Sequence, residues 1–134
     1  MKNKWAVVEK HFQYKGHDCI CIFNRNGFRC GYVSTTLNHD HHEIDIECHW
    51  GLTFSGVLPE EYAPKEPFYV GFDCGHCEDG LDTKLAYEYG LIDNITKERL
   101  DKAFFYLNDC PVRDVEYVEN ECKKIVDQLE ELEK

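Results

Sequence analysis

The sequence predicts an α+β fold, in which a mainly antiparallel β-sheet of meander order packs against a C-terminal amphipathic helix. Three observations lead to this prediction. Short β-branched and aromatic runs separated by turn residues fill most of residues 5–72. An Asn-Gly pair, which is a strong hairpin signal, lies at residues 26–27. Residues 115–132 instead carry apolar side chains at spacings of three and four, which is the period of a helix.

Six runs have the length and composition of strands. They are residues 5–14, 19–23, 28–33, 43–49, 52–57 and 68–72. Gly16-His17-Asp18 separates the first two runs, and the Asn26-Gly27 turn separates the second from the third. The first three runs should therefore pair as an antiparallel meander, and residues 34–42 should be a polar loop.

Two helices are predicted in the last third of the chain. Thr96 is expected to cap a helix that continues to Leu107, before Pro111 ends the segment. Asp114 is expected to cap the longer C-terminal helix. Its apolar stripe consists of Val115, Val118, Cys122, Ile125, Val126, Leu129 and Leu132. This stripe should cover the sheet, and the alternative is that its Leu129 and Leu132 end joins a homo-oligomer.

The length of 134 residues fits a single domain that can fold without a metal or disulfide bonds. Within residues 1–134, we expect 1–93 to be mostly sheet and loops and 94–134 to be mostly helical. No internal repeat, low-complexity tract or linker divides the chain.

Charge and targeting signals narrow the class of partner. Fifteen basic and 26 acidic residues give a formal net charge of −11, which opposes binding of a nucleic-acid polymer. A single nucleotide in a local pocket is still compatible with this charge. Neither a signal peptide nor an apolar run of membrane-spanning length is present, so we expect no membrane partner and a cytoplasmic location. The eight cysteines should then be reduced thiols.

Two segments concentrate glycine, histidine, aspartate, hydroxyl and aromatic side chains. They are residues 47–56 (ECHWGLTFSG) and residues 71–79 (GFDCGHCED). Each resembles an extended run that ends in a glycine-containing loop, and such loops often carry binding groups. We therefore predict one site that both segments line. The candidate ligand-binding residues are His49, Trp50, Thr53, Ser55, Phe72, Asp73, His76 and Asp79.

A pocket for a polar ligand is the first interpretation of these segments. Thr53 and Ser55 would share one strand face and donate to a phosphate or ribose, and the aromatic rings would stack on a base. Asp73 and His76 would contact the polar edge of that base. The glycines whose amides would approach a phosphate are Gly51, Gly71 and Gly75. In the alternative interpretation, Thr53 and Ser55 face solvent and Asp73 only stabilises a turn.

A zinc site is the second interpretation. Cys74, His76 and Cys77 are the candidate ligands, and His49 or Cys48 would supply a fourth. Only one Cys-x-x-Cys pair is present, whereas a zinc module has a second pair of ligands at matching spacing. The polar run at residues 39–42 (HDHH) is a further candidate for a weak surface metal site, although a polar loop with three histidines is more often simply solvated. We therefore expect no cofactor, with zinc as the alternative.

Catalysis is the third interpretation, with His49 or His76 as general base and Asp73 or Asp79 orienting it. The sequence has no nucleophile elbow, phosphate-binding loop or Gly-x-Gly-x-x-Gly motif. This absence favours a binding protein over an enzyme and leaves enzyme status open.

The two segments resemble a family of small proteins of bacteriophages, prophages and their hosts. Its members carry a His-Gly-Gly-Leu-Thr-Tyr/Phe-Ser segment followed by Gly-Phe-Asp-Cys-x-His-x-Gly-Asp, which stand here as HWGLTFSG and GFDCGHCED. Their closing Asp-x-x-Tyr-Val-x-x-Glu-Cys helix is matched at residues 114–122. Trp50 replaces the first glycine after the histidine, and residues 77–79 replace a small residue, glycine and aspartate.

This resemblance implies a phage or prophage origin, and small accessory phage proteins often act against host defence. Together with the candidate pocket, it leads to the hypothesis that the protein sequesters a small nucleotide-type immune signal. Two alternatives remain: an acidic interaction module or nucleic-acid mimic that inhibits a host defence protein, and a metal-dependent hydrolase. Salt dependence would separate mimicry from a closed pocket.

Overall fold

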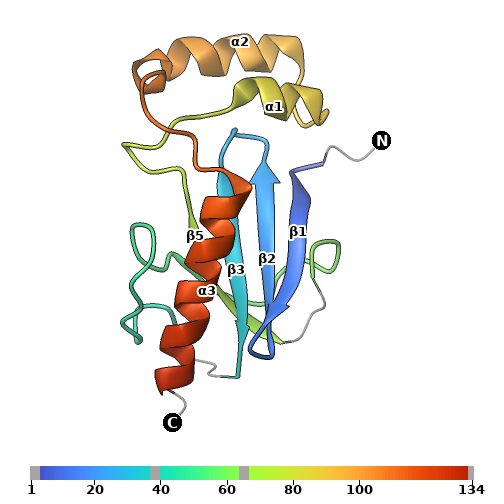
Figure 1. Ribbon diagram of the computed structural model, residues 1–134. Helices are drawn as coiled ribbons and strands as arrows, with labels where there is room; N and C mark the ends of the chain where they lie inside the picture. The colour runs from blue at the N-terminus through green and yellow to red at the C-terminus, as the bar shows by residue number, and fades with distance from the viewer. Residues whose placement is uncertain (1–3, 37–39, 64–66, 133–134) are drawn as a thin grey trace.

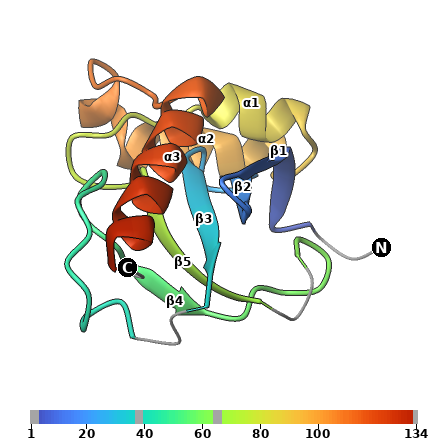
Figure 2. The same cartoon turned by 60° about the horizontal axis from the view of Figure 1, so that its bottom comes forward.

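The computed structural model describes residues 4–36, 40–63 and 67–132. Its centre is a five-stranded sheet in the order β1-β2-β3-β5-β4, in which every neighbouring pair is antiparallel (Figure 1). The strands are β1 (Ala6–Tyr14), β2 (His17–Asn24), β3 (Arg29–Thr35), β4 (Phe54–Gly56) and β5 (Phe68–Asp73). The first three form the predicted meander, and β5 then lies between β3 and the edge strand β4 (Figure 2).

The turn between β1 and β2 is shorter than predicted. His17 and Asp18 already belong to β2, where they pair with Tyr14 and Gln13. The chain reverses at Lys15 and Gly16, whose φ angles are 50° and 83°. Two successive positive φ angles are typical of the tight turn that matches the twist of a hairpin.

The strand predicted at residues 43–49 is wrong, because this segment consists of turns and irregular backbone. Its alternation of Ile44 and Ile46 with acidic residues resembles a strand, but no strand among the described residues pairs with it. The side-chain amide of Gln128 takes the place of a strand neighbour. It donates to the Glu47 carbonyl at 2.7 Å and accepts from the Glu47 amide at 2.6 Å.

Three α-helices and one 3₁₀ turn follow the sheet. They are α1 (Thr83–Glu88), α2 (Asn94–Ala103), η1 (Phe105–Leu107) and α3 (Val115–Leu132). The sequence did not predict α1. The cap of α2 is Asp93, which accepts from the Thr96 amide, so the prediction of Thr96 as the cap is wrong. The cap of α3 is Asp114 as predicted, because it accepts from the Tyr117 amide at 2.8 Å.

The predicted packing of the C-terminal helix on the sheet is confirmed, and with it the α+β class. α3 lies across one face of the sheet (Figure 1). The helix residues that are fully buried there are Val118, Cys122, Ile125, Val126 and Leu129. They contact Cys19, Cys21, Val33, Val70 and Phe72 of the sheet. Leu132, the last residue of the predicted stripe, is exposed.

The other face of the sheet is covered by the loop that follows β4. Leu58 and Ala63 of this loop pack on Ile20, Ile22 and Tyr69. At the end of the sheet, Phe23 packs against residues of α1 and its following turn. Because both faces are covered, β2 and β3 are buried almost throughout. Among the described residues, no helix has both the length and the apolarity that crossing a membrane requires.

Candidate functional site

The two glycine-containing segments meet beside the end of β5, and three side-chain contacts between predicted site residues help to join them. His49 bonds to Asp79, the Trp50 ring stacks on His76 with centroids 5.1 Å apart, and the Thr53 hydroxyl donates to Asp73 at 3.1 Å. The structure therefore brings together most of the predicted site residues. They are His49, Trp50, Thr53, Asp73, His76 and Asp79.

The other two predicted residues, Phe72 and Ser55, take no part in these contacts. Phe72 is buried under α3, where its ring packs over Gly31 so closely that a Cβ at that glycine would lie 2.5 Å from it. This ring belongs to the core, and Phe72 also lines the second cavity described below. The Ser55 hydroxyl lies 3.0 Å from the His41 amide and 2.9 Å from His41 Nδ1. Ser55 therefore holds the 40–43 turn against β4.

His49 connects three segments of the chain. Its Nε2–H donates to the Asp79 carboxylate at 2.8 and 3.0 Å, and its Nδ1 accepts from the Tyr117 hydroxyl of α3 at 2.7 Å. Burial raises the pKa of Tyr117, which keeps its hydroxyl protonated and able to donate. Both ring nitrogens of His49 are thus engaged within the chain. Its geometry is that of a structural connector, with no nitrogen left for a substrate.

Asp79 is the most buried acidic group of the site, with 1% of its surface exposed. Besides His49, it accepts from the His76 amide at 3.0 Å and faces Arg113 Nε at 3.5 Å. Arg113 also lies over the Tyr117 ring, 4.7 Å from its centroid. Sequence reasoning missed Arg113, which precedes the cap of α3. A buried carboxylate needs such partners because desolvation penalises its charge.

His76 and Arg113 carry the two buried side-chain nitrogens that lack a hydrogen-bond partner within the described part of the chain, Nε2 and Nε respectively. Each faces a carboxylate at a longer distance, since His76 Nε2 lies 3.4 Å from Asp73 Oδ1. Polar groups that are buried without a partner are rare and often belong to binding sites. Trp50 stacks on His76 and still exposes 54% of its surface. These side chains can approach a ligand that enters beside Trp50.

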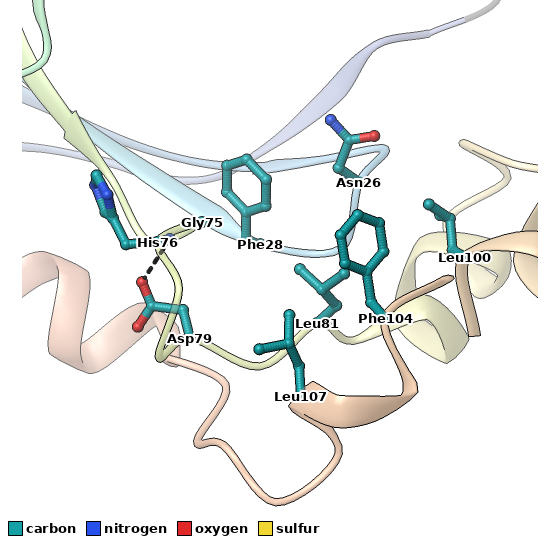
Figure 3. A pocket seen from close by; sticks show the side chains of 9 residues that line it. All are labelled: Asn26, Phe28, Gly75, His76, Asp79, Leu81, Leu100, Phe104 and Leu107. Carbon is teal, nitrogen blue, oxygen red and sulfur yellow. Dashed lines mark hydrogen bonds between the residues drawn. The ribbon is translucent and has the colours of Figure 1, made fainter. Parts of the chain in front are cut away.

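A cavity of about 230 Å³ adjoins these groups. Its walls are mostly apolar and come from segments that the sequence analysis did not assign to the site. The apolar lining residues are Phe28, Leu81, Leu100, Phe104 and Leu107. Figure 3 shows Asp79 and Gly75 on one side of this space and Asn26 on the other, with the Asp79 carboxylate turned toward the His76 amide. We call it the first cavity.

A second cavity of about 280 Å³ lies on the sheet face opposite α3. Thr53 and Asp73 line it, together with Phe28, which also lines the first cavity. Its remaining walls are Trp5, Asn24, Cys30, Tyr32, Phe54 and Phe72. Five of the predicted site residues are thus divided between two cavities, with His76 and Asp79 at the first and Thr53, Phe72 and Asp73 at the second.

The described residues do not support zinc binding at Cys74, His76 and Cys77. Cys74 is buried in the core while Cys77 is exposed, and burial raises the pKa of the Cys74 thiol. In the part of the chain that the structure describes, one group has ligand atoms that all lie within 4.8 Å of one another. It consists of Asp40, His41 and His42. His39, the first residue of the HDHH run, lies outside the described residues.

The glycine amides are also not free to bind an anion. The Gly51 amide donates to the Cys48 carbonyl at 2.8 Å, and the Gly75 amide donates to Asp73 at 3.1 Å. Gly71 lies inside the sheet, where it pairs with Tyr32 and Phe54. A phosphate would have to displace these bonds to contact the amides of these three glycines.

Comparisons with protein-family models, with curated proteins and with solved structures found no match to this chain.

Proposed function

We propose that the protein binds a small nucleotide-type ligand in the first cavity, which residues of the 71–79 segment line beside their junction with residues 47–56, and that it acts by sequestering this ligand. The observation that carries the proposal is the first cavity, which combines aromatic walls with polar groups at its edges. Typical cavities for drug-sized ligands measure roughly 300–1,000 Å³. At about 230 Å³, this cavity fits one ring system, and the rest of the ligand would lie outside it.

The chemistry of the walls suits a heteroaromatic ring. Phe28 and Phe104 offer aromatic faces for packing, and base–aromatic stacking contributes about 1–3 kcal/mol per base. Asn26 can both donate and accept at the ring edge. The Asp79 carboxylate already accepts from two groups of the chain, but its oxygens retain lone pairs for a ligand N–H. A ring with N–H donors and carbonyl acceptors, as in a nucleobase, matches this set.

One of the two general-base candidates, His49, is occupied within the chain, which favours sequestration over turnover at that residue, whereas His76 Nε2 has no hydrogen-bond partner among the described residues. His49 donates to Asp79 and accepts from Tyr117, so neither nitrogen can take a proton from a ligand without breaking an internal bond. A protein that only holds its ligand needs no such base. The resemblance to phage proteins suggests the biological role, which would be removal of a nucleotide-type immune signal in the cytoplasm of a bacterial host.

Titration calorimetry with a panel of purine and pyrimidine mononucleotides tests the proposal. Phe104→Ala removes one wall of the first cavity, and we expect it to weaken binding about tenfold or more. Phe105→Ala is the matched control, because Phe105 is the next residue, is 68% exposed and does not line the cavity. If no mononucleotide binds, or if the two variants bind alike, the proposal is wrong.

One observation favours a second candidate, an acidic module that binds a host protein. None of the side chains of α2 is buried, and Ile95, Phe105 and Tyr106 are exposed apolar residues on α2 and η1. The net charge of −11 would add electrostatic complementarity to a basic partner. Phe105→Ala would then abolish capture of that partner in a pull-down, added salt would weaken it, and Phe104→Ala would have a smaller effect.

A further inference from the structure

We infer that the second cavity binds a second ring system, so that the ligand is a dinucleotide whose two bases lie on opposite sides of Phe28. This inference rests on the proposed function, and it deepens that function by naming the ligand class. It is based on the arrangement of the two cavities, because Phe28 lines both and each has the volume for about one ring system.

Phe28 is held in place as a partition between the cavities. Its ring lies directly against Gly75, where an added Cβ would come within 2.6 Å of the ring atoms. Gly75 is therefore required for the ring to occupy this position. The loop after β5 passes on both sides of the partition, since Asp73 lines the second cavity while Gly75, His76 and Asp79 line the first. One ligand that follows this loop can reach both cavities.

The floor of the second cavity contains a buried amide with spare hydrogen-bonding capacity. Asn24 is only 1% exposed, and its Oδ1 accepts from the Asn26 amide at 3.0 Å and the Phe28 amide at 3.5 Å. Its Nδ2 faces the Cys30 sulfur at 3.8 Å. Sulfur is a weak acceptor, so this buried NH₂ group can form a stronger bond to a ligand carbonyl or ring nitrogen.

The electrostatics of this cavity suit an uncharged ring better than a phosphate. Burial raises the pKa of the Cys30 thiol to about 12, so the thiol is neutral at physiological pH. The charged group at the rim is the Asp73 carboxylate, which also accepts from Thr53. A carboxylate repels a phosphate but accepts from the amino and imino groups of a base. The rings of Trp5 and Phe54 complete the walls with stacking surfaces.

Calorimetry that compares a dinucleotide with the mononucleotide of the same base tests the inference. We expect the dinucleotide to bind at least about tenfold more tightly, because the second base adds its own stacking contribution. Trp5→Ala alters a partly exposed wall of the second cavity. It should lower the ratio of the dinucleotide affinity to the mononucleotide affinity toward one. Phe105→Ala is again the control and should leave the ratio unchanged.

The outcomes separate this inference from the function on which it rests. If the mononucleotide binds and Phe104→Ala weakens it, while the dinucleotide gains nothing and Trp5→Ala has no effect, the proposed function holds and the second subsite is wrong. If neither nucleotide binds, the proposed function fails and this inference fails with it. A higher affinity for the dinucleotide that Trp5→Ala does not reduce would also overturn the second subsite.

Discussion

His49 and Asp79 form a buried pair that ties the two glycine-containing segments together. Both carboxylate oxygens of Asp79 accept from His49 Nε2, at 2.8 and 3.0 Å, while His49 is 8% exposed. On its other side, His49 accepts from Tyr117 of α3. This chain of two contacts joins the loop before β4, the loop after β5 and the first turn of α3. The shape of the candidate site therefore depends on one histidine.

Asp79→Ala should be strongly destabilising. The substitution leaves the Nε2–H of His49 and the amide of His76 without their acceptor, and a buried donor without a partner costs about 1–3 kcal/mol. We expect the free energy of unfolding to fall by about 3 kcal/mol in urea titrations. Tyr117→Phe is the control, because it removes only one hydrogen bond and should cost about 1 kcal/mol. Equal costs for the two variants would show that Asp79 does not have this connecting role.

Trp50 has a φ angle of 58°, which is a left-handed conformation that non-glycine residues adopt at a cost of roughly 1–2 kcal/mol. Trp50→Gly removes this cost, whereas Trp50→Ala keeps it, and both lose the stacking on His76. We therefore expect the glycine variant to be more stable than the alanine variant by about 1 kcal/mol in urea unfolding. A more stable alanine variant would contradict the left-handed assignment.

Much of the fold could be predicted because its signals are local. The Asn26-Gly27 turn and the stripe from Val118 to Leu129 each report a structure that its own residues determine. The segment at 43–49 could not be predicted in this way. Its alternation matches a strand, but the hydrogen bonds of the Glu47 backbone come from Gln128, about eighty residues further on. The six residues of α1 are too few to show a helical period.

The position of the site could be predicted for a topological reason. β4 and β5 are antiparallel neighbours, so the chain entering β4 and the chain leaving β5 lie at the same end of the sheet. The burial of Phe72 could also have been inferred, because it shares a strand face with Val70 and not with Asp73. The walls contributed by Phe28 and Phe104 could not, because they depend on how α2 and η1 lie over the β2–β3 hairpin.

The two cysteines of the Cys-x-x-Cys pair should differ in reactivity. Cys77 is exposed, while Cys74 is buried in the core and burial raises its pKa. We expect a thiol-alkylating reagent at mildly alkaline pH to modify Cys77 first and to leave Cys74 unmodified in the folded protein, as peptide mass mapping would report. Zinc should not slow this reaction. Protection of both thiols by zinc would instead support a metal site at this pair.

The stability of the protein should fall in acid through two ion pairs that tie α3 to the first hairpin. The hydrogen bond from Lys10, at 2.7 Å, holds the pKa of Glu119 below its ordinary value, and the bond from Lys15, at 2.7 Å, does the same for Asp127. The unfolded carboxyls titrate near pH 4, so the folded state binds fewer protons there. The contribution of each pair is complete above that pH and is lost as the pH falls through the lowered pKa.

Glu119→Gln and Asp127→Asn should therefore flatten the decline in unfolding free energy below about pH 4, measured by urea titration across pH at low salt. Glu88→Gln is the control, because its carboxylate lies 4.0 Å from Lys84 on the exposed face of α1 and should leave the slope unchanged. An unchanged slope in all three variants would mean that neither lysine bond survives in solution.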